Sequence, residues 1–89
     1  MSAKIILPSV FKGIIDEDPI EVEGKSVGEC LSALVSLHPI LGKELFEGGG
    51  KLKTWIEIYV NTQSTYPEEL AYPVKDGDKI WVILLMAGG

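Results

Sequence analysis

The sequence predicts one α+β domain, in which a single helix covers one face of a mixed β-sheet. The chain has 89 residues, which is the length of one small domain. Only residues 26–38 repeat apolar side chains at helical spacing. Several shorter segments alternate apolar and polar residues, or are apolar throughout, as strands do.

The chain opens with a predicted hairpin. Residues 4–11 begin with a β-branched apolar run and include Pro8, and we expect a strand there with a turn near Gly13. Residues 20–23 alternate apolar and acidic side chains, which predicts a half-exposed strand that ends at Gly24.

The helix has a start signal, an apolar face and a stop signal. Ser26 is followed three residues later by Glu29, the pattern of a capping box. Pro39 ends the helix, because the residue before a proline disfavours the helical conformation. One apolar stripe comprises Val27, Cys30, Leu31, Leu34, Val35 and His38.

The second half of the chain contains two more predicted strands. Residues 40–53 show no clear period and contain a flexible triple-glycine loop at 48–50. Residues 55–60 alternate strictly, which predicts a strand. A tight turn at 76–78 precedes residues 80–85, which are apolar on both faces and therefore predict a central strand.

Alternation also predicts which side chains face away from the helix. If the helix covers Ile56, Ile58, Val60, Ile80 and Val82, the opposite face of the sheet carries aromatic residues. Aromatic side chains on an open face are typical of partner-binding surfaces, unless the segment between residues 39 and 53 folds over them. The candidate partner-binding residues are Trp55, Tyr59, Trp81, Ile83, Leu85 and Ala87.

Several functional classes are disfavoured by composition. A net charge of −5 without any basic run argues against nucleic-acid binding. No apolar run approaches the ~20 residues that span a bilayer, and no signal segment is evident, so we expect a cytoplasmic protein without membrane contact. The chain has one Cys and one His, so we expect neither a disulfide nor a metal site, and structural roles for Cys30 and His38. The Gly48–Lys51 stretch lacks the first glycine and the final Ser or Thr of a phosphate loop.

The remaining candidate for chemistry is the C-terminal diglycine. We expect residues 1–86 to form the domain and residues 87–89 to form a flexible tail. Glycine lacks Cβ, so Gly88 and Gly89 can enter a narrow channel and present the terminal carboxylate to ATP without a clash. Adenylation would make this carboxylate an electrophile. The alternative is that the two glycines have no chemical role.

The Asp76-Gly77-Asp78-Lys79-Ile80 passage and the Ala87-Gly88-Gly89 ending resemble the MoaD/ThiS family of ubiquitin-like sulfur carriers. An early Ile-x-x-Pro-like strand, Lys51-Leu52 and Ile58-Tyr59-Val60-Asn61 resemble the CysO-type carriers of cysteine biosynthesis more closely. The resemblance implies a β-grasp fold and a C-terminal thiocarboxylate, with Gly88 and Gly89 as the functional glycines and Ala87 as the small residue before them. Leu84-Leu85-Met86 departs from the family, where many members have a proline near the tail.

The same resemblance implies partners and a cycle. An E1-like enzyme would use ATP to adenylate the Gly89 carboxylate, and the carrier itself would bind no cofactor. The acceptor would be a cysteine synthase-like enzyme or the large subunit of molybdopterin synthase; thiazole carriers are typically shorter. The chain would be a protein co-substrate rather than an enzyme. Two alternatives stay open, a ubiquitin-like modifier that forms isopeptide bonds through Gly89 and a non-catalytic interaction domain.

Overall fold

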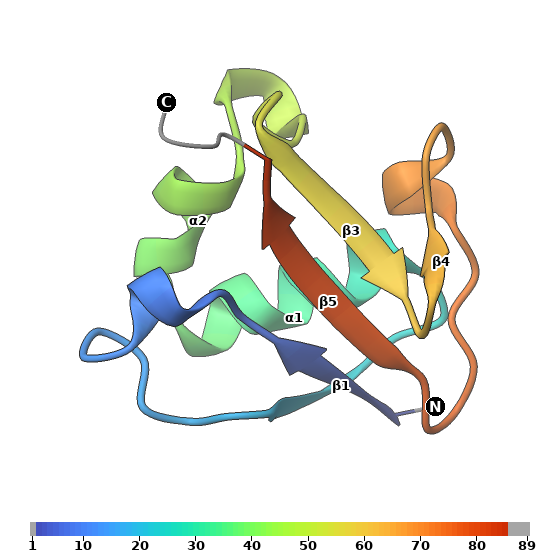
Figure 1. The fold of residues 1–89 in the computed structure, drawn as a ribbon, viewed down its shortest axis with the longest axis horizontal. Coiled ribbons are helices and arrows are strands. Elements are labelled where there is room, and N and C mark those ends of the chain that lie inside the picture. Colours follow the sequence, from blue (N-terminus) through green and yellow to red (C-terminus); the bar gives the residue numbers. More distant parts are fainter. Residues whose placement is uncertain (1, 86–89) are drawn as a thin grey trace.

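A computed structural model describes residues 2–85. It contains a five-stranded mixed sheet in the order β2-β1-β5-β3-β4, with α1 packed on one face (Figure 1). The strands are β1 (Ser2–Ile6), β2 (Ile20–Glu23), β3 (Ile56–Val60), β4 (Gln63–Ser64) and β5 (Lys79–Leu84). The helices are α1 (Val27–Leu37) and α2 (Ile40–Leu45), with short 3-10 helices η1 (Ser9–Phe11), η2 (Gly48–Gly50) and η3 (Glu69–Ala71).

Strand β5 lies at the centre of the sheet, as its two apolar faces predict. It pairs in parallel with β1, where Ile5 lies beside Ile80. It pairs antiparallel with β3, where Ile58 lies beside Val82. Both edges of β5 are therefore hydrogen-bonded, and β5 is the middle strand of the five.

The predicted hairpin forms, but its first strand is shorter than expected. Strand β1 pairs antiparallel with β2 and ends at Ile6, so the prediction of a strand over residues 4–11 is wrong beyond that residue. Pro8 has no N–H to donate to a sheet, and the chain turns there into η1. The N–H of Phe11 donates to the carbonyl of Pro8 at 3.1 Å, and the Phe11 ring is buried under this turn.

Helix α1 starts and ends as predicted. The Ser26 hydroxyl accepts a hydrogen bond from the N–H of Glu29 at 3.1 Å. The Glu29 carboxylate reaches back and accepts from the N–H of Lys25 at 2.8 Å. These two bonds satisfy donors that the first helical turn leaves open, and the helix ends at Leu37, two residues before Pro39.

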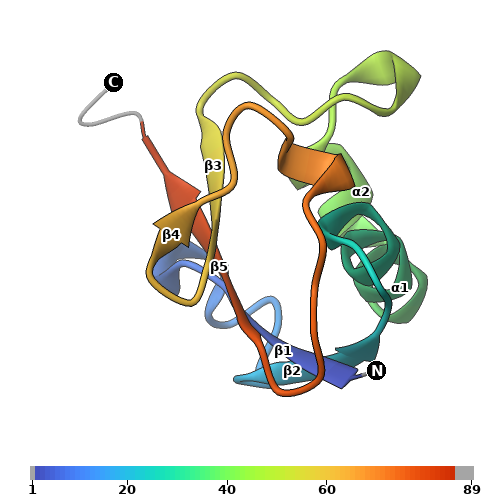
Figure 2. The same ribbon diagram turned by 90° about the vertical axis from the view of Figure 1, so that its right-hand side faces the viewer.

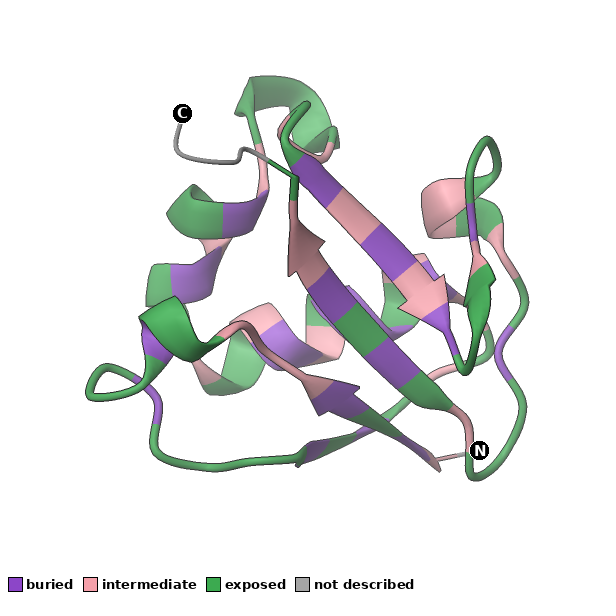
Figure 3. Ribbon diagram, in the orientation of Figure 1, coloured by how far each residue is buried: buried purple, intermediate pink, exposed green. Residues whose placement is uncertain are grey.

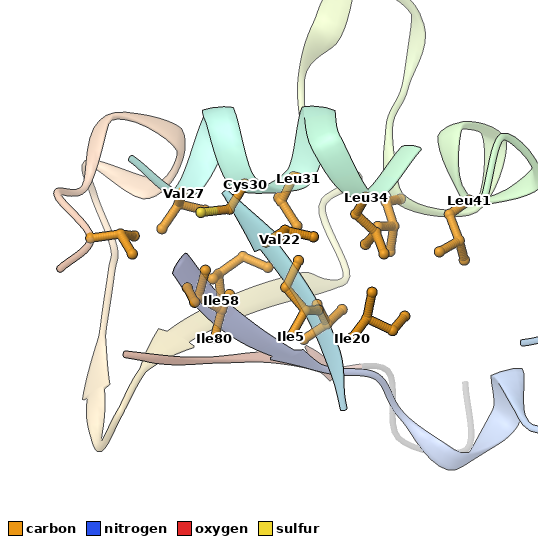
Figure 4. Close-up of a cluster of buried hydrophobic side chains, with 14 of the residues drawn as sticks. Ile5, Ile20, Val22, Val27, Cys30, Leu31, Leu34, Leu41, Ile58 and Ile80 are labelled. Atoms are coloured by element: carbon orange, nitrogen blue, oxygen red, sulfur yellow. The ribbon is translucent and has the colours of Figure 1, made fainter. Parts of the chain in front are cut away.

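The core lies between α1 and one face of the sheet (Figures 3 and 4). Side chains from α1, including Leu31 and Leu34, point toward sheet residues such as Ile5 and Ile80 (Figure 4). The buried sheet residues are Ala3, Ile5, Ile20, Val22, Ile56, Ile58, Val60, Ile80 and Val82. Burying one Leu or Ile side chain stabilises a fold by about 1.5–3 kcal/mol, so this layer supplies most of the driving force.

Residues 39–53 are more ordered than the sequence indicated. They contain α2, which buries Leu41 and Leu45, four residues apart on one helical face. Figure 2 shows α1 and α2 on the same side of the sheet, so this segment extends the helical layer. The segment therefore leaves the opposite face of the sheet uncovered.

The packing of α1 predicts a contrast between two leucines on the same helix. Leu34 is fully buried, whereas Leu37 is 57% exposed. Leu34→Ala should lower the free energy of unfolding by about 2–5 kcal/mol, because it removes buried methyl groups and leaves a cavity. Leu37→Ala should change it by no more than about 0.5 kcal/mol. Urea unfolding followed by circular dichroism measures both, and equal effects would contradict this packing.

Candidate functional site

The outward face of the sheet carries a row of apolar side chains along β5 and β3. Trp81 lies beside Tyr59 on one neighbouring strand and beside Ile6 on the other. Ile83 follows two residues later on the same face, opposite Glu57. The Trp81 side chain is 40% exposed, while Tyr59 and Ile83 are half-buried by their neighbours. Figure 3 shows the alternation of exposed and buried residues along β5.

Trp55 and Leu85 extend this face beyond the ends of the two strands. The N–H of Leu85 donates to the carbonyl of Trp55 at 2.8 Å, which adds one more hydrogen bond after the last paired residues. Trp55 is 42% exposed and Leu85 is 52% exposed. The five candidate partner-binding residues within residues 2–85 therefore have accessible surface on or beside one open face. Their role in binding stays a prediction.

Polar and charged side chains surround these apolar residues. The ammonium of Lys53 lies 5.4 Å from the centre of the Trp55 ring, a cation–π contact. The Glu57 carboxylate accepts a hydrogen bond from the Ser64 hydroxyl at 2.6 Å. Lys53, Glu57 and Ser64 were not among the predicted site residues. Lys53 could have been noticed in the sequence, because it is a charged residue just before the alternating segment. The bond between Glu57 and Ser64 could not, because it depends on the pairing of β3 with β4.

The predicted chemical residues, Gly88 and Gly89, and the candidate partner-binding residue Ala87 lie outside the described residues. The structure does place Leu85, the last described residue. Leu85 follows directly on the central strand and is hydrogen-bonded to Trp55. The starting point of the predicted tail is thus fixed relative to the open face.

Cys30 and His38 have the structural surroundings that the sequence predicted. The Cys30 thiol is buried in the core, and burial raises its pKa, with further upward contributions from the charges of Glu29 and Glu23. A raised pKa keeps the thiol protonated and unreactive. His38 lies at the C-terminal end of α1, with its Nε2 atom 3.5 Å from the Glu17 carboxylate.

Residues 2–85 contain neither a cluster of metal-ligating side chains nor a membrane-spanning helix. No group of three or more His, Cys, Asp and Glu side chains there is arranged to hold a metal ion. None of the helices in that range has the length and apolar character needed to cross a membrane. Gly48–Gly50 forms the exposed η2 turn, with positive φ angles at Gly49 and Gly50.

The sheet order, the single crossing helix and the open sheet face define a ubiquitin-like β-grasp protein. The sequence agrees with this class: the model of the ThiS family matches residues 9–89, and the chain belongs to that family. The predicted membership in the MoaD/ThiS sulfur carriers is thereby confirmed. No curated protein sequence matches the chain.

Solved structures agree with the fold over the whole chain. SAMP1 of Haloferax volcanii is 24% identical over 100% of both chains, with a TM-score of 0.85. CysO of Amycolatopsis orientalis, solved in complex with BexX, is 27% identical over 98% of this chain and 99% of that one, with a TM-score of 0.85. CysO of Mycobacterium tuberculosis is 20% identical over 94% of this chain and 99% of that one, with a TM-score of 0.83.

The buried thiol predicts a pH dependence of stability. The fold raises the pKa of Cys30, so the unfolded chain loses this proton first, above about pH 8.5. Stabilisation from the buried neutral thiol is complete below that pH and is lost as the pH rises toward the folded-state pKa. Urea unfolding between about pH 8 and pH 10 should therefore show a steeper loss of stability for the wild type than for Cys30→Ala. If the stability of both proteins falls with pH at the same rate, a raised pKa of Cys30 is excluded.

Proposed function

We propose that this chain is a sulfur carrier whose chemical group is the carboxylate of Gly89. The observation that supports this most strongly is the match to the ThiS family, which extends through residue 89 and so includes the Ala87-Gly88-Gly89 ending. The likeness to two CysO structures supports the same class. The carrier is a co-substrate of other enzymes and is not an enzyme itself.

The proposed cycle starts at an E1-like activating enzyme. A carboxylate oxygen of Gly89 attacks the α-phosphate of ATP, and pyrophosphate leaves. A sulfide-class nucleophile then attacks the acyl-adenylate carbonyl, the C–O bond to AMP breaks, and a thiocarboxylate remains. The acceptor enzyme takes the sulfur, and water restores the carboxylate. The carrier holds no cofactor in this cycle, because ATP is bound by the activating enzyme.

The fold supports this chemistry because it holds the end of β5 in a fixed position. Strand β5 is paired on both edges, and Leu85 is hydrogen-bonded to Trp55. A partner that grips the open face therefore finds the start of the tail at a fixed position. Glycines at 88 and 89 let the last residues pass a narrow entrance, because they carry no Cβ. Precise placement of a reacting group is a major source of rate acceleration.

For the acceptor, we favour a cysteine synthase-like enzyme. The likeness to two CysO structures supports this choice, and the structure of CysO of Amycolatopsis orientalis in complex with BexX supports only that a carrier of this kind binds a partner protein. The large subunit of molybdopterin synthase is the alternative acceptor. Incubating the thiocarboxylate form with each acceptor and its substrate, and measuring sulfur in the product, distinguishes the two.

A second candidate function is protein modification. The same acyl-adenylate could be attacked by a lysine amine, which would form an isopeptide bond and release AMP. The observation that favours it is the shared fold with SAMP1, a small archaeal modifier protein. Conjugates detected with an antibody to this chain would support modification, and a thiocarboxylate without conjugates would support sulfur transfer.

The carrier proposal predicts a defined change in mass. Incubation with ATP, an E1-like enzyme and a sulfide source should replace one oxygen of the chain by sulfur, which intact-mass spectrometry detects. Deletion of Gly89 should abolish the change, since it moves the reactive carbon by one residue, about 3.3–3.6 Å. An unchanged wild-type mass, with enzymes that are active on other carriers, would contradict the proposal.

The open face gives a separate prediction. Trp81→Ala should lower the efficiency of sulfur loading by about 30-fold, the effect of losing a hot spot of about 2 kcal/mol. Trp81 is 40% exposed and packs beside Tyr59 and Ile6, so the variant should also lose some stability, and its loading is measured where circular dichroism shows that it is folded. Leu37→Ala, an exposed truncation on α1, is the matched control and should load like the wild type. Equal loading by both variants would exclude Trp81 from docking.

A further inference from the structure

A hollow beside the end of β1 belongs neither to the closed core nor to the open face. Leu7, Pro8, Phe11 and Ile15 supply its apolar lining, and its volume is about 220 Å³. Phe11 and Ile15 are part of the core cluster, which holds the floor of the hollow in place. Sites for small organic ligands usually measure about 300–1,000 Å³, so this hollow is better suited to a single side chain of a partner protein.

Two apolar side chains next to these lining residues are exposed to solvent. Val10 precedes Phe11 in η1 and is 62% exposed, and Ile14 precedes Ile15 and is 55% exposed. The turn that carries them is fixed, because the N–H groups of Ile14 and Ile15 both donate to the carbonyl of Phe11, at 3.1 and 2.9 Å. Apolar side chains on a fixed turn beside a hollow are typical of a protein-binding surface. We call the hollow together with Val10 and Ile14 the η1 surface.

The rim of the hollow is acidic. Asp16, Glu17 and Asp18 line it together with one basic residue, Lys12. Glu17 lies 3.5 Å from the His38 imidazole, whereas Asp16, Asp18 and Lys12 have no ion pair within 4.0 Å among residues 2–85. The carboxylates at the rim are not arranged to hold a metal ion. Three carboxylates and one lysine leave the rim with an excess of negative charge.

An arginine side chain has the two properties that such a hollow requires. Its methylene groups can cover the apolar lining while the guanidinium reaches the rim. The planar guanidinium donates paired hydrogen bonds to carboxylates and is more weakly hydrated than an ammonium group. Arginine is also enriched among the residues that dominate binding at protein interfaces. A partner with an arginine between apolar residues could therefore fill the hollow and contact Val10 and Ile14 at the same time.

A second copy of this chain does not fit that description. The sequence contains no arginine, and all eight of its basic residues are lysines. Two copies that met at the η1 surface through a two-fold axis would also bring Asp16 and Asp18 of one copy against those of the other. Like charges that face each other across an interface oppose association. The partner is therefore expected to be a different protein.

The η1 surface lies at the end of the sheet where β5 ends. Strands β1 and β5 are parallel, and β1 stops at Ile6, whereas β5 continues to Leu84 (Figure 1). The chain that leaves β1 passes through Leu7 and Pro8, which line the hollow. The hollow and Leu85 are therefore at the same end of the sheet. An enzyme that acts on the C-terminal carboxylate is in a position to contact the η1 surface as well.

We propose that the η1 surface binds the acceptor enzyme of the carrier cycle, and that an arginine of this enzyme, flanked by apolar residues, occupies the hollow against Asp16 and Asp18. This inference rests on the proposed carrier function. The activating enzyme and the acceptor handle the same carboxylate in turn, and the loaded chain differs from the unloaded chain by a single atom. A surface that only the acceptor uses lets it hold the carrier without competing for the contacts made during loading. Asp16 and Asp18 are positioning residues, because neither takes part in the transfer of sulfur.

The test compares two double variants with the same change in net charge. One is Asp16→Asn with Asp18→Asn; the control is Glu47→Gln with Glu68→Gln, which are exposed and lie outside the hollow. Each chain is first loaded by an E1-like enzyme, and the probe is a cysteine synthase-like enzyme that consumes the wild-type thiocarboxylate. At low salt the first variant should lose about tenfold in kcat/KM for sulfur transfer, with a smaller loss at high salt, and should be loaded like the wild type. The control should match the wild type in both steps.

Val10→Ser covers the case in which the first variant does not fold. It should also lower kcat/KM for sulfur transfer with loading unchanged, but salt should not alter the loss, because the contact is apolar. Wild-type transfer by either folded variant, or an equal loss in loading and transfer, would overturn the inference and leave the carrier function standing. A wild-type chain that is loaded but whose sulfur no acceptor takes would also overturn it. A wild-type chain that no activating enzyme loads would overturn the inference and the carrier function together.

Discussion

Strand β5 is hydrogen-bonded along both edges, in parallel to β1 and antiparallel to β3, and the rest of the fold depends on this double pairing. The pairing aligns the buried residues of three strands into one apolar surface, which α1 then covers. Because side chains alternate, the same alignment places Trp81 between Ile6 and Tyr59 on the other face. One set of backbone bonds therefore sets both the stability of the core and the composition of the open face.

The function that we propose separates the folded domain from the reactive group. The described side chains form a core and a surface, and the nucleophile that might have been suspected, Cys30, is buried with a raised pKa. In the function that we propose, the terminal carboxylate needs no pocket in the carrier, because an activating enzyme would supply the ATP site. The carrier would have to supply a rigid surface, and the bond between Leu85 and Trp55 holds the last described residue against that surface.

Local patterns in the sequence predicted much of this arrangement. Strict alternation predicted β2 and β3, and apolar residues on both faces predicted the central position of β5. Ser26 with Glu29 predicted the start of α1. The predicted end of β1 was wrong because Pro8 has no N–H to donate to the sheet, although apolar residues continue beyond it. Helix α2 was missed because two buried leucines in six residues are too few to show a period.

The candidate site was predictable only in part, for a physical reason. The outward orientation of Trp81 and Tyr59 follows from alternation within one strand. The adjacency of Lys4 and Lys79 depends on the register between strands that are far apart in the sequence, and no local pattern encodes that register. Which charged side chains lie next to each other on different strands is therefore visible only in the folded structure.

The central claim is that the Gly89 carboxylate is activated as an acyl-adenylate. The most direct measurement is ATP–pyrophosphate exchange catalysed by an E1-like enzyme, with the wild-type chain, the Gly89 deletion and a chain extended by one alanine. Exchange that depends on the wild-type chain and is lost with both altered termini is the predicted result. Exchange that is equal for all three chains, or absent for the wild type with enzymes that activate other carriers, would contradict the claim.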